Sequence, residues 1–207
     1  MTSKVYFDEV AQQWDTLRER FYSDNVREQA LAIAAVQPGR LAADIGAGTG
    51  FITEGLIGRG LQVIAVDQSA TMLAEMQKKF AGVTQIDYRL GEAESLPIPA
   101  ETVDYVFANM FLHHVERPAE TIQALARLLK PGGKLVITDT DEHNHTFLRE
   151  VHHDRWLGFP RADIHNWFRQ AGLQHITVED MGENCCTTDA CGGEGINISI
   201  FVAVGEK

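Results

Sequence analysis

The sequence has no excess of basic residues, no apolar run of membrane length and no spread of cysteines. It contains 18 Lys and Arg and 29 Asp and Glu, and the resulting net charge of -11 argues against binding a nucleic-acid backbone. The longest apolar runs have the length of a strand, so we expect no membrane span. The N-terminus lacks a signal-peptide core, and the three cysteines fall within seven positions near the C-terminus. We therefore expect a protein of the reducing cytoplasm.

Residues 1–207 are long enough for one domain with a full core. From residue 41 onward, short apolar segments with strand character alternate with segments of helical spacing, which predicts an α/β fold with a mainly parallel sheet. We divide the domain into an N-terminal helical cap (1–37), a core (38–141) and a C-terminal part with helices and a hairpin (142–207). The predicted strands are 41–45, 62–67, 85–90, 103–109, 134–139, a sixth around Ile176 and Val178, and a last one at 196–204.

The centre of the pattern is LAADIGAGTG, residues 41–50, in which a short apolar strand runs into a turn with three glycines. Apolar residues at helical spacing follow at once, so the glycines lie at a strand-to-helix junction. Glycine permits close approach of a ligand to the backbone, and the helix start offers free N–H groups. Asp67 ends the next predicted strand 21 positions after Gly46, the interval at which doubly wound folds place a carboxylate against ribose hydroxyls.

The glycine spacing differs from the dinucleotide pattern G-x-G-x-x-G, because Phe51 stands where the last glycine belongs. DIGAGTG instead resembles the first motif of the class I S-adenosylmethionine-dependent methyltransferases, in the type 11 group with the ubiquinone, menaquinone and arsenite methyltransferases. GEAESLP, VDYVFANMFLHHV and LLKPGGKLVITD resemble later motifs of the same family. The resemblance implies a Rossmann-like, doubly wound, mainly parallel seven-stranded sheet with a final antiparallel strand. It also implies S-adenosyl-L-methionine as cofactor and S-adenosyl-L-homocysteine as product.

The resemblance assigns cofactor contacts residue by residue. Asp67 is expected to accept hydrogen bonds from the ribose diol, and Glu92 stands where the family usually has Asp for the adenine amino group. Asp44 is assigned to the turn and the cofactor's ammonium, with capping of the glycine loop as the alternative; for Met72 the alternative is ordinary helix core. The predicted cofactor-binding residues are Asp44, Gly46, Ala47, Gly48, Gly50, Asp67, Gln68, Met72, Glu92, Ala93, Asn109 and Met110.

Ligands of this fold bind outside the carboxyl ends of the parallel strands, so the segments that follow strands four, five and six are expected to form the acceptor site. They carry six of the eight histidines and, in a predicted loop at 182–195, all three cysteines. The N-terminal stripe with Trp14 resembles the segment that closes the acceptor pocket in these enzymes, although it also fits a helix packed on the sheet edge. We predict His114 as the catalytic residue and Trp14, His143, His152, Cys185, Cys186 and Cys191 as substrate-binding residues.

The nature of the acceptor stays open between several hypotheses. Cysteine thiolates bind thiophilic centres, which favours a thiol or an arsenite-like metalloid as acceptor. An oxygen or carbon atom of a quinone-like or aromatic metabolite is the second hypothesis, and a sensor of S-adenosylmethionine or of a metal without turnover is the third. Cys185, Cys186 and Cys191 lack a standard zinc spacing, so we assign no resident metal to the chain. The sequence does not give the oligomeric state.

Overall fold

The computed structural model of the chain describes residues 3–187 and 196–207. Seven strands carry the fold, and they occur in the expected order along the chain. The strands are β1 (Leu41–Ile45), β2 (Gln62–Asp67), β3 (Ile86–Leu90), β4 (Val103–Asn109), β5 (Leu129–Thr140), β6 (Gln174–Thr187) and β7 (Ile196–Glu206). The α-helices are α1 (Ser3–Val10), α2 (Trp14–Arg18), α3 (Asn25–Ala34), α4 (Phe51–Gly58), α5 (Ala70–Lys79), α6 (Pro118–Leu128), α7 (Leu148–Val151) and α8 (Arg161–Gln170). Two short 3₁₀ helices are η1 (Ala11–Gln13) and η2 (Leu112–His114).

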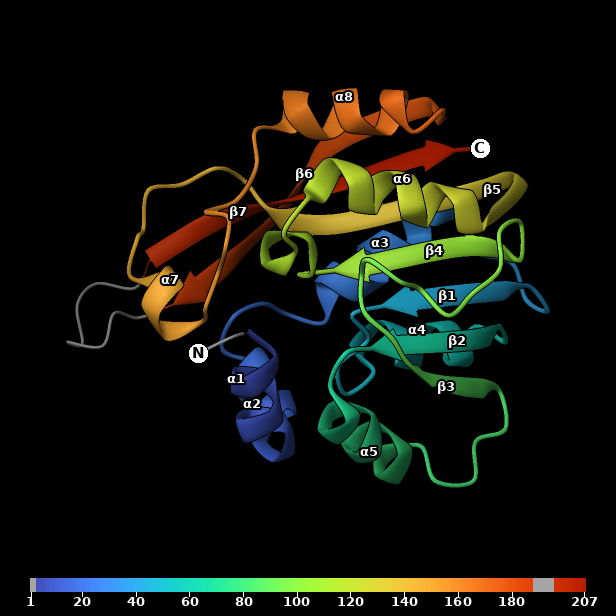
Figure 1. The fold of residues 1–207 in the computed structure, drawn as a ribbon, viewed down its shortest axis with the longest axis horizontal. Coiled ribbons are helices and arrows are strands. Elements are labelled where there is room, and N and C mark those ends of the chain that lie inside the picture. The colour runs from blue at the N-terminus through green and yellow to red at the C-terminus, as the bar shows by residue number, and fades with distance from the viewer. Residues whose placement is uncertain (1–2, 188–195) are drawn as a thin grey trace.

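All seven strands form one sheet in the order β3-β2-β1-β4-β5-β7-β6 (Figure 1). The first five strands pair in parallel, whereas β7 lies antiparallel between β5 and β6. The strand order reverses between β1 and β4, the kind of switch point outside which doubly wound sheets bind ligands. The predicted α/β class and the doubly wound, mainly parallel sheet with a final antiparallel strand are confirmed.

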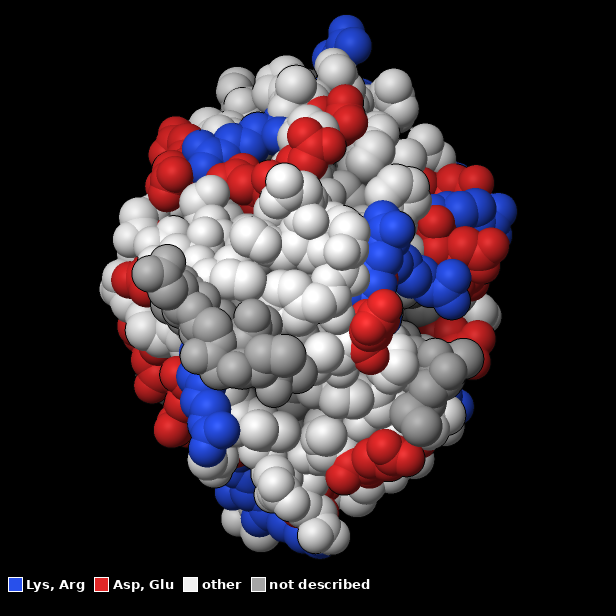
Figure 2. Space-filling model, turned by 90° about the vertical axis from the view of Figure 1, so that its left-hand side faces the viewer, with Lys and Arg blue, Asp and Glu red and all other residues white. Residues whose placement is uncertain are grey.

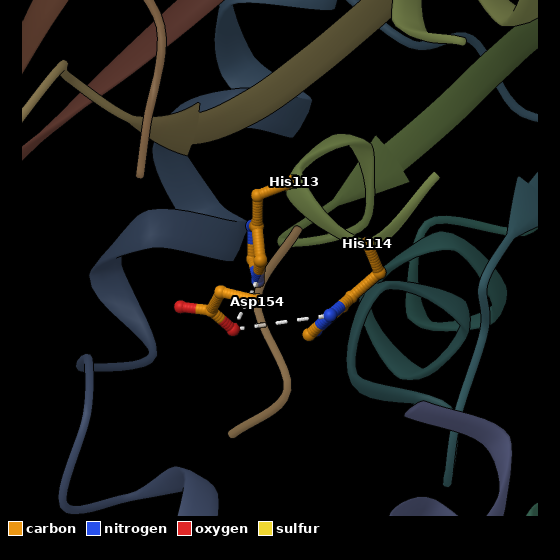
Figure 3. Close-up of side chains that lie close together, drawn as sticks. All are labelled: His113, His114 and Asp154. Atoms are coloured by element: carbon orange, nitrogen blue, oxygen red, sulfur yellow. Dashed lines mark ion pairs between the residues drawn. The ribbon is translucent and has the colours of Figure 1, made fainter. Parts of the chain in front are cut away.

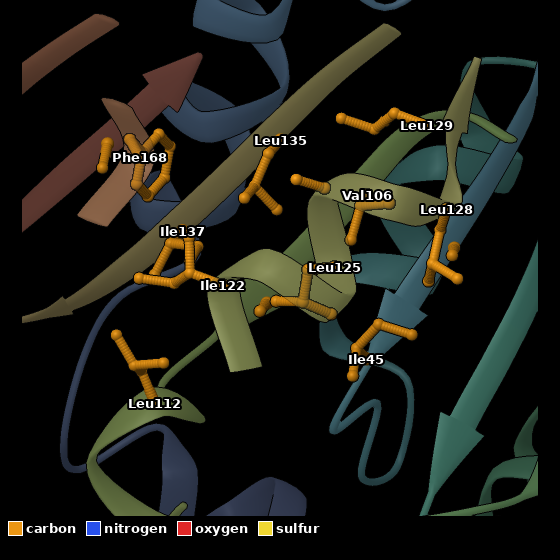
Figure 4. Close-up of a cluster of buried hydrophobic side chains, with 14 of the residues drawn as sticks. Ile45, Val106, Leu112, Ile122, Leu125, Leu128, Leu129, Leu135, Ile137 and Phe168 are labelled. Carbon is orange, nitrogen blue, oxygen red and sulfur yellow. The ribbon is translucent and has the colours of Figure 1, made fainter. Parts of the chain in front are cut away.

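Alternation along each strand sends apolar side chains to both faces of the sheet. On one face, Ile45 and Val106 pack against α6 and α8, a cluster that includes Ile122, Leu125 and Phe168 (Figure 4). On the other face, α3 and α4 cover β1, β2, β4 and β7, while α5 packs over β2 and β3. Both faces are therefore closed, and the carboxyl edge of the parallel strands is left for a site.

Two predicted turns are part of longer strands in the structure. The KPGG turn at 130–133 lies inside β5 as an irregularity, because Val103 pairs with Leu129 and Tyr105 with Lys134. The predicted cysteine loop at 182–195 is wrong at its start, since β6 continues to Thr187 and its outer end pairs with β7. Antiparallel pairing with the long final strand supplies backbone partners there, so the chain extends as a hairpin arm beyond the sheet edge.

The N-terminal helices lie across the carboxyl edge of the sheet (Figure 1). Polar contacts attach them to the core: Ser69 donates a hydrogen bond to Asp8 at 2.5 Å, and Asp15 accepts one from Thr49 at 2.5 Å. Lys79 adds an ion pair with Asp15 at 3.2 Å. Across the residues that the structure describes, no helix combines the length and the apolar character needed to cross a membrane.

Candidate active site

The glycine turn between β1 and α4 forms the floor of the site. The amides of Gly46 and Ala47 donate to the carbonyl of Val66 at 2.9 and 3.0 Å, which ties the turn to the end of β2. Gly46, Gly48 and Gly50 all have positive φ, at 68°, 55° and 94°. Residues with a β-carbon rarely adopt this conformation, so the three glycines are a backbone requirement of the turn.

A first cavity of about 450 Å³ opens above this turn, a size within the usual range for small-molecule sites. Strand ends β1, β2 and β4 surround it together with the segment after β3 and the N-terminal helices. Ten of the predicted cofactor-binding residues line this cavity: Gly46, Ala47, Gly48, Asp67, Gln68, Met72, Glu92, Ala93, Asn109 and Met110. The glycine turn, the strand end with Asp67 and the motifs GEAESLP and VDYVFANMFLHHV thus converge on one space, whereas LLKPGGKLVITD contributes no wall residue.

Asp67 is the buried carboxylate of the first cavity. One of its oxygens accepts the amide of Gly48 and the other the amide of Ser69, both at 2.8 Å. Burial raises the pKa of Asp67, while these hydrogen bonds act in the opposite direction. Each carboxylate oxygen keeps a second lone pair, so the side chain retains acceptor capacity toward the cavity. Ser69 accepts the amide of Met72 at 3.0 Å and so caps α5 as predicted.

Asp44 and Gly50 lie outside the wall of the first cavity. Asp44 is buried, and one oxygen accepts both the amide and the hydroxyl of Thr53, at 3.0 and 2.7 Å. Burial raises the pKa of Asp44 to about 7. These bonds from Thr53 agree with the capping role given as the alternative for Asp44, and its contact with the cofactor's ammonium stays a prediction. Gly50 precedes α4, where an added β-carbon would meet Phe80 at 2.5 Å.

A second cavity of about 80 Å³ lies beside the first, between the N-terminal helices and the segments after β4 and β5. Its wall is largely aromatic and includes Tyr6, Phe21 and Tyr22. The rings meet edge to face, as in the pair of Phe7 and His114 with centroids 5.1 Å apart. Both cavities share the wall residues Phe7, Trp14, Tyr22, Met110 and His114.

His113, His114 and Asp154 point toward one another in the wall of the second cavity (Figure 3). The Asp154 carboxylate lies 3.8 Å from Nε2 of His113 and 3.8 Å from Nδ1 of His114. The amides of Arg155 and Trp156 donate to the carbonyl of His113, both at 3.1 Å, and hold the two chain segments together. We call these three side chains the His–His–Asp cluster.

Asp139 lies behind this cluster, at the end of β5. It is fully buried, and its carboxylate bonds Nδ1 of His113 at 2.8 Å. Burial alone would lower the pKa of His113, but attraction to Asp139 outweighs it and raises the pKa to about 9. For His114, burial and the adjacent His113 both lower the pKa well below its ordinary value. The imidazole of His113 therefore favours the protonated, charged form, whereas that of His114 favours the neutral form.

The predicted substrate-binding residues have different outcomes. Trp14 lines both cavities, and His143, His152 and Cys185 line the second. Cys186 pairs with Asn197 in the β6–β7 ladder, so it lies in a strand and not in the predicted loop. Cys191 lies outside the described residues. Burial is also the main cause that lowers the pKa of His143, to about 4, and that of His152.

Several residues of the site were not assigned a role from the sequence. Tyr6, Phe21, Tyr22 and Asp154 line the second cavity, and Asp139 supports His113 from behind. The aromatic residues stand out in the N-terminal segment, but spacing alone does not show which rings face a site. For Asp154 the sequence holds no signal, because its position depends on backbone contacts to a segment about 40 residues earlier.

The surface at this end of the molecule has uncharged side chains over its middle, with charged residues of both signs around them (Figure 2). The acidic residues of the chain are therefore not gathered at the middle of this face.

Comparison with known proteins gives a consistent set of matches. A family model described as a methyltransferase domain matches residues 43–137. The ubiquinone biosynthesis O-methyltransferase of Xanthomonas axonopodis pv. citri (strain 306) is 32% identical over 166 residues, covering 72% of this chain and 69% of that protein. The demethylmenaquinone methyltransferase of Renibacterium salmoninarum is 32% identical over 136 residues, covering 64% of this chain and 56% of that protein.

Among solved structures, this chain is similar to a putative methyltransferase in complex with the Trm112 methyltransferase activator of Haloferax volcanii. The TM-score is 0.82 at 20% identity, and the match covers 99% of this chain and 97% of that one. Several curated relatives extend well beyond the match, since this chain covers 27%, 49%, 47% and 56% of four of them.

Proposed function

The chain belongs to the class I S-adenosylmethionine-dependent methyltransferases of the type 11 group, and we propose that it methylates a small-molecule acceptor held in the second cavity. One observation carries this proposal: the two cavities share five wall residues. A cofactor in the first cavity thereby adjoins an acceptor in the second. S-adenosylmethionine supplies an electrophilic methyl group when bound, and S-adenosylhomocysteine is the product.

The residues of the first cavity fit such a cofactor. Asp67 presents a buried carboxylate at a strand end, suited to a ribose diol. At Gly48 an added β-carbon would project toward Trp14, 3.6 Å from its indole nitrogen, into space that the glycine leaves open. Glu92 is exposed on the rim of the cavity, where its longer side chain can reach an adenine amino group.

The methyl group passes directly from the cofactor to the acceptor, so the protein need not supply a covalent nucleophile. Its contribution is to hold the acceptor atom in line with the methyl group and to exclude water. Asn109 donates to the hydroxyl of Tyr22 at 3.1 Å and accepts from Thr138 at 2.7 Å, which fixes the boundary between the cavities. His114, whose lowered pKa keeps it neutral, is the candidate general base for an acceptor hydroxyl.

The wall of the second cavity supports a hydroxylated aromatic acceptor of the phenol or quinol class. Aromatic rings from the N-terminal segment bind a flat apolar body, and the His–His–Asp cluster provides the polar groups that a hydroxyl requires. Two relatives bear names from quinone biosynthesis, ubiquinone and menaquinone, which agrees with this class of acceptor.

A thiol or trivalent metalloid is the second candidate acceptor, and Cys185 in the wall of the second cavity is the observation that favours it. This chemistry requires reduced thiols and thus the cytoplasmic location expected from the sequence. A soft acceptor needs no strong base, so it would not depend on His114. The two candidates consequently differ in which side chain transfer requires.

The test is methyl transfer from labelled S-adenosylmethionine by the purified chain. The acceptor panel contains substituted hydroquinones and catechols, arsenite and a small thiol. Turnover with a hydroquinone that is lost in His114→Gln and kept in Cys185→Ser supports the first candidate, whereas the reverse pattern supports the second. Cofactor affinity without turnover across the panel would favour a sensor. Absence of affinity for S-adenosylhomocysteine in calorimetry would contradict the cofactor assignment itself.

A further inference from the structure

We propose that His113, His114 and Asp154 bind one divalent transition-metal ion of the zinc class in the wall of the second cavity. Each residue offers one donor atom, and these three atoms all lie within 4.8 Å of one another. Figure 3 shows both imidazoles directed toward the same carboxylate oxygen of Asp154. The residue types are those that Zn²⁺ and its neighbours in the first transition row accept as ligands.

The separations of the Asp154 oxygen from the two imidazole nitrogens suit a common ion. Donors that bind one Zn²⁺ at about 2.0–2.2 Å lie roughly 3 to 4 Å from each other. The Asp154 oxygen is 3.8 Å from Nε2 of His113 and 3.8 Å from Nδ1 of His114, beyond a hydrogen bond but within this range. A direct hydrogen-bonded pair would instead show a distance near 2.8 Å, as between His113 and Asp139.

Two of the donor atoms are buried without a hydrogen-bond partner. These are Nδ1 of His114 and Oδ1 of Asp154, and they stand out among the side chains that the structure describes. Only 10% of the Asp154 side chain and 11% of the His114 side chain are exposed. Buried polar atoms are almost always paired, so unpaired ones that face each other point to a missing partner. A cation that displaces the proton of the His113 ring would satisfy all three donor atoms at once.

Asp139 completes the arrangement in the manner of a metal centre. Histidine ligands usually donate their second ring nitrogen to a carboxylate, which fixes the tautomer and strengthens the ligand. Asp139 bonds Nδ1 of His113 and thereby turns Nε2 toward Asp154. It also accepts the backbone amide of His113 at 3.3 Å, so the imidazole is fixed at both its ring and its backbone.

Two imidazoles and one carboxylate leave coordination positions free, and the second cavity is where they open. The role of the ion, unlike its binding, rests on the proposed function. It would bind the oxygen of a hydroxylated acceptor and lower the pKa of its hydroxyl, so that the proton passes to solvent water before methyl transfer. In the metal-bound form Nδ1 of His114 would be a ligand, and the ion would replace His114 as the group that promotes loss of this proton. Cys185 in the same wall is the competing donor, and its softer sulfur gives a distinguishable signature.

The experiment is a titration of the reduced, chelator-treated full chain with Co²⁺, followed by competition with Zn²⁺. We expect one equivalent of Co²⁺ per chain, a visible spectrum of nitrogen and oxygen donors, and displacement by Zn²⁺. His114→Gln and Asp154→Asn should each weaken binding by roughly a hundredfold or more. Asp139→Asn should weaken it by about 10- to 100-fold, as outer-shell losses do. The matched control is His165→Asn, an exposed histidine on α8 that should bind as the wild type.

Three results would overturn the proposal: a wild-type chain that binds no Co²⁺, variants of the His–His–Asp cluster that bind it normally, or binding that depends on the cysteines. Binding through the cysteines would give a sulfur-to-cobalt charge-transfer band in the spectrum of the Co²⁺-loaded chain. That band would disappear in a Cys185→Ser, Cys186→Ser, Cys191→Ser variant. X-ray absorption at the zinc edge distinguishes nitrogen and oxygen ligands from sulfur ligands in the wild-type chain, without any variant. Circular dichroism and S-adenosylhomocysteine affinity, measured without metal, check the folding of each variant. They also separate a failure of this site from a failure of the proposed function.

Discussion

The two cavities of this molecule are built in opposite ways. The floor of the first comes from a continuous turn of the chain and from the ends of adjacent parallel strands, with backbone hydrogen bonds between Gly46 and Val66. The second is assembled from side chains of five separate segments, from Tyr6 to Ile198. The first cavity therefore depends on backbone conformation, whereas the second depends on how distant elements pack. We therefore expect substitutions in the connecting segments to alter the second cavity more readily than the first.

The largest effect should follow from a β-carbon in the glycine turn. Gly46→Ala places a side chain against the ring of Phe111 at a positive φ, which combines strain with overpacking. We expect a loss of about 2–4 kcal/mol in the free energy of unfolding and of detectable S-adenosylhomocysteine binding. Chemical denaturation and calorimetry measure the two quantities.

Gly132→Ala is the matched control for that change, because Gly132 also has a positive φ of 77° but has open space around it. It should cost only about 1 kcal/mol of strain and leave cofactor affinity unchanged. Equal losses in both variants would mean that the glycine turn has no special relation to the first cavity.

Asp67→Asn should have the next largest effect. It tests the charge of a side chain in the first cavity, whereas Gly46→Ala tests the space and backbone conformation of the glycine turn. Loss of a charge-assisted hydrogen bond should weaken S-adenosylhomocysteine binding by about 1.5–3 kcal/mol, or roughly 10- to 100-fold. Asp44→Asn serves as control, since Asp44 is also buried, on the adjacent strand, but does not line the cavity. Calorimetry that finds the same loss in both variants would refute the separate roles assigned to them.

Phe21→Ala should affect the second cavity alone, because Phe21 lines that cavity and not the first. We expect the KM for the acceptor to rise by about tenfold, equivalent to roughly 1.4 kcal/mol of lost aromatic contact. Affinity for S-adenosylhomocysteine should stay as in the wild type. Trp14→Ala is the comparison variant, since Trp14 lines both cavities and should change both quantities. An effect of Phe21→Ala on cofactor affinity would show that the cavities are not independent.

A change in pH dependence at Asp44 tests the folded state alone, without a ligand. Its pKa is raised from 3.8 to about 7 in the folded protein, so the folded state binds the proton more tightly than the unfolded state. This contribution to stability is full below pH 3.8 and is lost as the pH rises to about 7. Asp44→Asn should therefore flatten the decline of the unfolding free energy across this interval, as measured by urea denaturation. An unchanged slope would contradict the buried, protonated state.

The sequence allowed the strand order along the chain, the glycine junction and most residues of the first cavity to be predicted. These features are local or depend on strand ends, because parallel strands deliver their carboxyl ends to one edge whatever packs around them. The predicted loop was wrong where strand pairing extends further, because Cys185 and Cys186 lie in β6. The predicted KPGG turn falls at a break in the register of β5. The length of a strand depends on how far its partner strand extends beside it, and the sequence pattern of one strand does not show this.

The amino-acid sequence by itself determined the α/β fold, the turn from Gly46 to Gly50 and the carboxylate of Asp67 at its strand end. Periodicity, glycine conformation and chain connectivity act over short distances, so they can be read directly. Only the tertiary structure decided that Asp154 meets His113 and His114, that Asp139 supports them, and that N-terminal aromatic rings form the wall of the second cavity. Those contacts join segments far apart in the chain, and the packing that brings them together depends on the whole core.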